Sequence, residues 1–126
     1  MKIDNAVITI QNLRLRTFIG FNPEELEKQQ DVVINASIAY EAGRACDTDE
    51  ENRALDYKVI TKQMIRHVEE GRFRLLEKLT ADLLEIAMSS PQAIRASVTV
   101  DKPHALRFAD SVSLTLSATR EDQMPG

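Results

Sequence analysis

Residues 56–87, DYKVITKQMIRHVEEGRFRLLEKLTADLLEIA, decide the fold, because apolar side chains recur there at helical spacing on both sides of Gly71. The apolar positions of the first half are Tyr57, Ile60, Met64 and Val68. Those of the second half are Leu75, Leu76, Leu79, Leu83, Ile86 and Ala87. We predict two consecutive amphipathic helices, the first capped by Asp56 and ending at Gly71, the second ending before Pro91.

Alternating apolar and polar residues flank the two helices on both sides, which is the period of half-buried strands. Two such segments precede the helices and two follow them: residues 6–15, 32–40, 96–101 and 111–118. In the first segment the apolar parity switches between Ile10 and Leu13, which predicts a bulge near Gln11 and Asn12. The predicted order is therefore ββααββ.

This order predicts an α+β fold in which both helices cover one face of a four-stranded, mostly antiparallel sheet. We expect residues 1–119 to form a single domain and residues 120–126 a flexible tail. The other sheet face carries small polar residues where a face in bulk water usually carries charges: Ser97, Thr99, Ser111, Ser113, Thr115 and Ser117. We expect this face to line a cavity between subunits whose sheet edges pair.

Composition narrows the class of function. The net charge of −4 argues against a general nucleic-acid binder, and the strands lack the aromatic residues on which an RNA-binding sheet stacks bases. No apolar run is long enough to span a bilayer, no secretory pattern opens the chain, and one cysteine excludes an internal disulfide, which together indicate a cytoplasmic protein. No metal is expected, because His67 and His104 have no carboxylate or cysteine at ligand spacing.

Four polar residues at or near the ends of predicted elements could act together: Glu25, Tyr57, Glu77 and Lys102. Each also has an ordinary structural explanation. Glu25 could be a surface carboxylate and Tyr57 a core ring. Glu77 could be an acid that complements a helix N-terminus, and Lys102 a charge at a strand end. Spacing alone does not choose between these interpretations.

Four longer stretches carry a resemblance to a known family: NLRLRTFIGFNPEELEKQQDVVIN (12–35), ALDYKVITK (54–62), RFRLLEKLTADLL (72–84) and VTVDKPHALRFADSVSLTL (98–116). In this order and at similar separations, they resemble the dihydroneopterin aldolases, and most closely the dihydroneopterin triphosphate 2'-epimerases of that family. FIG stands where aldolases usually have a histidine before the glycine, and HALRFADS follows the lysine. The resemblance covers nearly the whole chain.

The resemblance implies the tunnelling fold, or T-fold, in which ββααββ subunits join their sheets into a barrel. It implies a homo-octamer of two stacked tetramers, active sites between subunits, a small pterin substrate and no cofactor. Glu77 matches the carboxylate that accepts from two adjacent N–H donors of the pterin, with Leu76 as an apolar wall beside it. Leu55, Asp56 and Tyr57 match a segment supplied by the neighbouring subunit.

The implied reaction is epimerisation at C2' of 7,8-dihydroneopterin triphosphate by reversible cleavage of the C1'–C2' bond. Lys102 matches the general acid and base near N5 of the pterin. Glu25 matches the carboxylate that organises water and proton transfer, and Tyr57 is placed by analogy to move protons on the side-chain hydroxyls.

The triphosphate requires cations, for which Arg107 and His104 are the first candidates, with Arg16 and Arg72 behind them. Two alternatives remain open. One is a 7,8-dihydroneopterin aldolase of folate biosynthesis, which releases 6-hydroxymethyl-7,8-dihydropterin and glycolaldehyde. The other is an assembled barrel that binds a pterin without catalysis.

Overall fold

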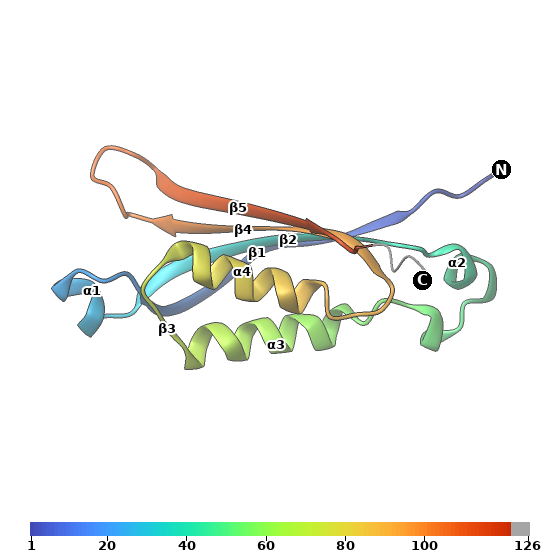
Figure 1. Cartoon of the computed structure of the whole chain (residues 1–126), viewed down its shortest axis with the longest axis horizontal. Coiled ribbons are helices and arrows are strands. Elements are labelled where there is room, and N and C mark those ends of the chain that lie inside the picture. Colours follow the sequence, from blue (N-terminus) through green and yellow to red (C-terminus); the bar gives the residue numbers. More distant parts are fainter. Residues whose placement is uncertain (122–126) are drawn as a thin grey trace.

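The computed structural model describes residues 1–121 and has two layers, a sheet and a pair of helices (Figure 1). The long strands are β1 (Ala6–Ile19), β2 (Gln30–Tyr40), β4 (Ala93–Pro103) and β5 (Ser111–Thr119). The long helices are α3 (Tyr57–Glu70) and α4 (Leu76–Ala87). Short elements lie in the connections: α1 (Pro23–Glu27), α2 (Gly43–Thr48), the 3-10 helix η1 (Glu51–Arg53) and β3 (Arg72–Phe73). The predicted ββααββ order is confirmed, and the short elements add to it.

The strands are arranged in the order β3-β1-β2-β4-β5. The four long strands pair antiparallel, as predicted, and β3 adds two residues parallel to the end of β1. The predicted bulge in β1 is confirmed, because its register with β2 shifts between Ile10 and Leu13. Asn12 has a φ of 54° there, and its N–H donates to Asn35 Oδ1 at 2.9 Å. The bulge lets the apolar residues on both sides of it face the same layer.

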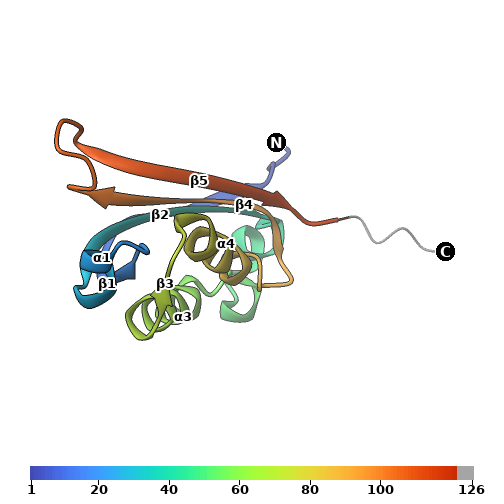
Figure 2. The same cartoon turned by 60° about the vertical axis from the view of Figure 1, so that its left-hand side comes forward.

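Both long helices cover the same face of the sheet (Figure 2). Asp56 Oδ1 accepts the N–H of Val59 at 3.1 Å, so α3 begins at the predicted cap, and it ends at Gly71. The buried Thr17 hydroxyl on β1 donates to the Val68 carbonyl at 2.6 Å and ties the sheet to the end of α3. The core lies between the layers, and its fully buried members include Ile34, Ile38, Met64, Leu79, Leu83 and Val98.

The opposite face of the sheet carries the predicted serine and threonine side chains. Thr99 and Thr115 share a hydrogen bond of 2.7 Å across β4 and β5, and Ser117 donates to Ser97 at 3.2 Å. Both edges of the sheet have free positions in the described part of the chain: β5 pairs on one side alone, and β3 covers only the last two residues of β1. Open edges of this length favour pairing with another chain.

The chain after β5 begins with an anchored residue. The Arg120 N–H donates to the Ile94 carbonyl at 2.8 Å, and its guanidinium donates to three carbonyl groups around the connection from α4 to β4, each at 2.8 Å. Residues 122–126, most of the expected flexible tail 120–126, lie outside the described residues. Over residues 1–121, no helix is both long enough and apolar enough to cross a membrane.

Candidate active site

An acid and a lysine from distant parts of the chain meet at one end of the sheet. Lys102 lies near the end of β4, and Glu25 lies in α1, the short helix between β1 and β2. Lys102 Nζ donates to Glu25 Oε2 at 3.0 Å. Their side chains are only 15% and 21% exposed, so water screens the attraction less than it would for a surface pair.

The Glu25 carboxylate is held by further contacts. The Asn22 N–H donates to Oε1 at 3.4 Å, and Gln30 Nε2 donates both to Oε2 at 3.2 Å and to the Ile19 carbonyl at 2.6 Å. Gly20, with a φ of 122°, packs against the carboxylate, and a β-carbon at this position would overlap it. Glycine is needed here for both its backbone conformation and the space it leaves.

These contacts set the charge of the pair. Partial burial acts to raise the pKa of the Glu25 carboxyl, but hydrogen bonds from Lys102 and two other donors, with the Lys102 charge, outweigh it. The net pKa therefore lies below its ordinary value, and the carboxylate is ionised at neutral pH. It holds the Lys102 ammonium in place through a hydrogen bond and an ion pair.

Glu77 and Leu76 lie in the first turn of α4, at the same end of the molecule as the pair (Figure 1). The chain reaches this turn directly from β3, which pairs with the last residues of β1, next to Gly20. Leu76 is half-buried against the core, whereas Glu77 is exposed on a turn whose free N–H groups favour negative charge. The fold thus brings Glu25, Lys102, Leu76 and Glu77 to one end of the sheet.

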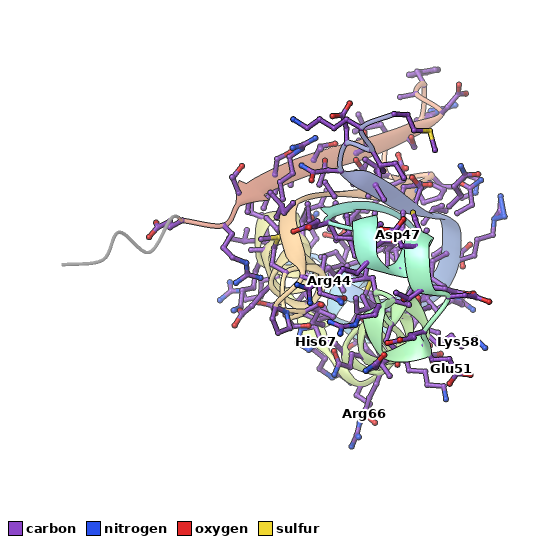
Figure 3. The ribbon with its side chains drawn as sticks, turned by 90° about the vertical axis from the view of Figure 1, so that its right-hand side faces the viewer. Arg44, Asp47, Glu51, Lys58, Arg66 and His67 are labelled. Atoms are coloured by element: carbon purple, nitrogen blue, oxygen red, sulfur yellow. The ribbon has the colours of Figure 1, made fainter. Side chains whose placement is uncertain are left out.

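The predicted segment 55–57 lies at the other end. Gln92 Nε2, just before β4, donates to the Arg53 carbonyl at 3.1 Å, which places this part of the chain beside the start of β4. Lys102 is near the end of the same strand, about 30 Å away at the rise of an extended chain. Figure 3 faces this other end, where charged side chains gather on α2, η1 and the start of α3: Arg44, Asp47, Glu51 and Lys58.

The residues of segment 55–57 differ in what they can offer a ligand. Leu55 is buried in its own chain at 2% exposure, and the Asp56 carboxylate is engaged in capping α3. Tyr57 is 48% exposed, which excludes its interpretation as a core ring. Within one chain Tyr57 does not reach Lys102.

The residues predicted to bind phosphate differ in whether an acidic side chain already pairs with them. His104 and Arg107 are exposed in the loop between β4 and β5, just beyond Lys102. Arg16 is in an ion pair with Asp31 at 3.2 Å. Its charge is therefore already compensated, whereas the loop residues have no ion-pair partner among the described residues.

The sequence assigns no role to three residues of this region: Gly20, Gln30 and Arg74. A lone glycine before Asn22 was a signal for Gly20, but the contacts of the Gln30 side chain depend on tertiary structure. Arg74 lines a pocket of about 60 Å³ together with Gly20, Glu25 and Arg72. No group of three or more side chains suited to a metal ion occurs in residues 1–121.

The comparisons with known proteins agree with this geometry. Two helices on one face of an antiparallel sheet, in the order ββααββ, make this a T-fold protein. The family model for dihydroneopterin aldolase, FolB, matches residues 8–117. The chain belongs to the dihydroneopterin aldolase family, which confirms the resemblance found in the sequence.

Named relatives indicate which members of the family this chain is similar to. A dihydroneopterin triphosphate 2'-epimerase of Escherichia coli K12 is 54% identical over 115 residues, which cover 91% of this chain and 96% of that protein. The protein of the same name from Pseudomonas aeruginosa is 52% identical over 115 residues, which cover 91% and 94%. The solved structure of E. coli dihydroneopterin aldolase in complex with neopterin has a TM-score of 0.84 at 24% identity, covering 90% of this chain and 98% of that one, and shows the shared fold.

Proposed function

We propose that the protein is a dihydroneopterin triphosphate 2'-epimerase, which inverts C2' in the side chain of 7,8-dihydroneopterin triphosphate. The observation that carries the proposal is the Glu25–Lys102 pair, an ionised acid that holds a lysine ammonium in a partly shielded position. Identities of 54% and 52% over most of the chain, to proteins named for this reaction, support the choice of activity.

Glu77 binds the pterin ring. The ring amide and the exocyclic amine of a pterin are adjacent N–H donors, and one carboxylate accepts from both. Glu77 is exposed in the first turn of α4, where the helix favours its ionised form. Leu76 supplies an apolar wall beside it. A pterin held there lies at the end of the sheet that carries Lys102.

The reaction begins with cleavage of the C1'–C2' bond. The C2' hydroxyl loses its proton, and its oxygen forms the carbonyl of an aldehyde. The electron pair of the broken bond moves into the N5=C6 imine of the pterin, and N5 takes a proton, which gives an enamine. The Lys102 ammonium, held by Glu25, supplies the proton to N5, and Tyr57 moves the proton of the side-chain hydroxyl.

Inversion follows when the same bond forms again from the other side. The enamine carbon C1' attacks the opposite face of the aldehyde, whose oxygen takes back a proton through Tyr57, and N5 returns its proton to Lys102. C2' is then inverted, which gives the dihydromonapterin triphosphate of the tetrahydromonapterin series. If the aldehyde leaves first, C1' takes a proton, N5 gives up its own, and 6-hydroxymethyl-7,8-dihydropterin forms. The two outcomes share one mechanism and differ in how tightly the fragment is held.

A complete site needs two subunits. In one chain the segment that carries Tyr57 lies near the start of β4, whereas Lys102 lies near its end, so Tyr57 contacts this substrate only from a neighbouring copy, with Leu55 and Asp56 beside it. The open edges of β1 and β5 and the serine and threonine face support a barrel of subunits. We propose a homo-octamer of two stacked tetramers in the cytoplasm, in which His104 and Arg107 border the substrate.

A dihydroneopterin aldolase of folate biosynthesis is the second candidate, because the family model is that of the aldolase. Purified protein should be given 7,8-dihydroneopterin triphosphate and, separately, 7,8-dihydroneopterin, with inversion at C2' and release of the aldehyde both measured. We expect inversion of the triphosphate to dominate. Faster aldehyde release from the unphosphorylated substrate would instead favour the aldolase.

The catalytic role of Lys102 is tested in the same assay. We expect Lys102→Ala to lower kcat at least about 100-fold while pterin affinity is retained, since Glu77 is intact. Lys62→Ala removes an equal charge from an exposed site on α3 and serves as the control, with activity unchanged. An active Lys102→Ala protein would contradict the mechanism.

A further inference from the structure

A larger hollow adjoins the pocket that contains Glu25. The small pocket of about 60 Å³ and a hollow of about 750 Å³ share three lining residues, Arg72, Phe73 and Arg74. These residues form β3 and the turn into α4, so the hollow lies next to the first turn that carries Glu77. A volume of this size is within the range of small-molecule sites.

The acids that line the larger hollow already have cationic partners. Glu70 pairs with Arg66 at 3.3 Å, and Asp82 contacts Lys78 at 2.9 Å and His67 at 2.8 Å. Hydrogen bonds from Lys78 and His67 hold the pKa of the Asp82 carboxyl below its ordinary value despite partial burial, which alone would raise it. These acids therefore leave the charge of the neighbouring arginines uncompensated.

Arg72 and Arg74 have no acid within ion-pair distance in the part of the chain that the structure describes. The Arg72 guanidinium lies 3.8 Å from the ring centroid of Phe18 and donates to the Leu26 carbonyl at 3.2 Å, which fixes its position. Arg74 is exposed and makes no side-chain hydrogen bond to the described residues. The two arginines are the sequence neighbours of buried Phe73, and both line the hollow. Arg72 is therefore held in position, and the Arg74 side chain is free to move onto a ligand.

We infer that this hollow binds the triphosphate of the substrate and that Arg74, supported by Arg72, selects the phosphorylated substrate over the unphosphorylated one. The inference rests on the proposed function and names the part of the site that reads the phosphates. Guanidinium groups bind phosphate oxygens through paired hydrogen bonds, and a polyanion gains most where cations are uncompensated. Arg72 and Arg74 are the arginines that share a pocket with Glu25.

The test compares the two substrates in one variant series. We expect Arg74→Ala to lower kcat/KM for 7,8-dihydroneopterin triphosphate by about 10- to 100-fold, the effect of losing one charge-assisted contact. Turnover of 7,8-dihydroneopterin should change little. Arg74→Lys keeps the charge without the paired donors, so its kcat/KM for the triphosphate should lie between those of the wild type and Arg74→Ala. Lys62→Ala should leave the ratio of kcat/KM for the two substrates unchanged.

Inorganic tripolyphosphate provides a readout that does not depend on turnover. By calorimetry, it should bind the wild-type protein and the Lys62→Ala variant alike, and the Arg74→Ala variant at least about 10-fold more weakly. The inference is overturned if Arg74→Ala keeps the wild-type ratio of kcat/KM for the two substrates, or if it binds tripolyphosphate as tightly as the wild type does. This holds even if Arg107→Ala alters the substrate ratio. If the wild type turns over neither substrate, the proposed function fails, and the tripolyphosphate measurement still decides whether Arg74 binds phosphate.

Discussion

Glu25 shows how much one side chain depends on its surroundings. Its carboxylate receives Lys102 and Gln30 on one oxygen and the Asn22 N–H on the other, and it rests against Gly20. Each contact removes freedom from the acid, so the Lys102 ammonium is held in one place. In the proposed reaction this lowers the free-energy cost of ordering the proton donor.

Gly20→Ala should disturb this arrangement. The new β-carbon overlaps the Glu25 carboxylate, and the φ of 122° is costly for alanine, so we expect a loss of about 1–3 kcal/mol in the free energy of unfolding. Epimerase kcat/KM should also fall, by more than the loss of folded protein explains, because Glu25 and Lys102 separate. Urea unfolding and kcat/KM measure the two effects.

The matched control for this change is Gly43→Ala. A β-carbon at Gly43, in the first turn of α2, meets nothing within 4 Å. We expect its stability to stay the same or rise by less than about 1 kcal/mol. Equal effects of the two substitutions would show that the carboxylate does not need the space at Gly20.

At the scale of elements, α1 is held by its contacts with the rest of the fold. A helix of five residues is too short to be stable alone, and its tie to β4 is the Glu25–Lys102 ion pair. The same pair that serves catalysis in our proposal therefore orders the connection between β1 and β2. Stability and activity should respond together to its loss.

Glu25→Gln tests this tie through pH. The folded pKa of Glu25 is lowered, so its ion pair contributes stability above the unfolded pKa, and that contribution is lost as the pH falls through the folded pKa. The variant should be less stable than the wild type at pH 7, and the difference should narrow as acid protonates Glu25. Urea unfolding over a series of pH values measures it.

Glu24→Gln is the control for that series. Glu24 lies in the same first turn, is exposed and forms no ion pair with the described residues. Its difference from the wild type should stay within about 0.5 kcal/mol at every pH. If the difference in unfolding free energy between Glu25→Gln and the wild type does not narrow in acid, the ion pair is not its source.

For the whole molecule, the division of the predicted site between two ends is the main consequence of the fold. Lys102 and Glu25 lie at one end, and Tyr57 lies at the other. Two variants that each lack one half should therefore restore each other in a mixed assembly. When Lys102→Ala and Tyr57→Ala subunits are co-expressed in equal amounts, about a quarter of the sites should contain both native residues.

Activity of the purified hybrid measures this restoration. Each variant alone should be nearly inactive, and the hybrid should recover up to about a quarter of the wild-type kcat. Co-expression of Lys102→Ala with Glu25→Gln is the control, because both changes affect the same half and no mixture restores it. Recovery in neither mixture would argue against a shared site in which Tyr57 of one subunit acts with Lys102 of another.

The site was predicted from the sequence only in part. The sequence marks Glu25, Glu77 and Lys102 as polar residues near element ends, the family resemblance implies their roles, and the fold brings them to one end of the sheet. Spacing alone could not join Glu25 to Lys102, because their contact depends on how α1 folds back toward β4. Arg74 was missed, since an exposed arginine beside Phe73 has no distinguishing local pattern.

The sequence by itself determined the elements of this protein, because helix and strand periods, the Asp56 cap and the parity switch at the β1 bulge are local properties of the chain. It also determined the family, through motifs spread over most of the chain. Only the tertiary structure decided which side chains meet. Strand pairing sets those distances, and it placed Lys102 against Glu25 while leaving Tyr57 away from both, near the start of β4.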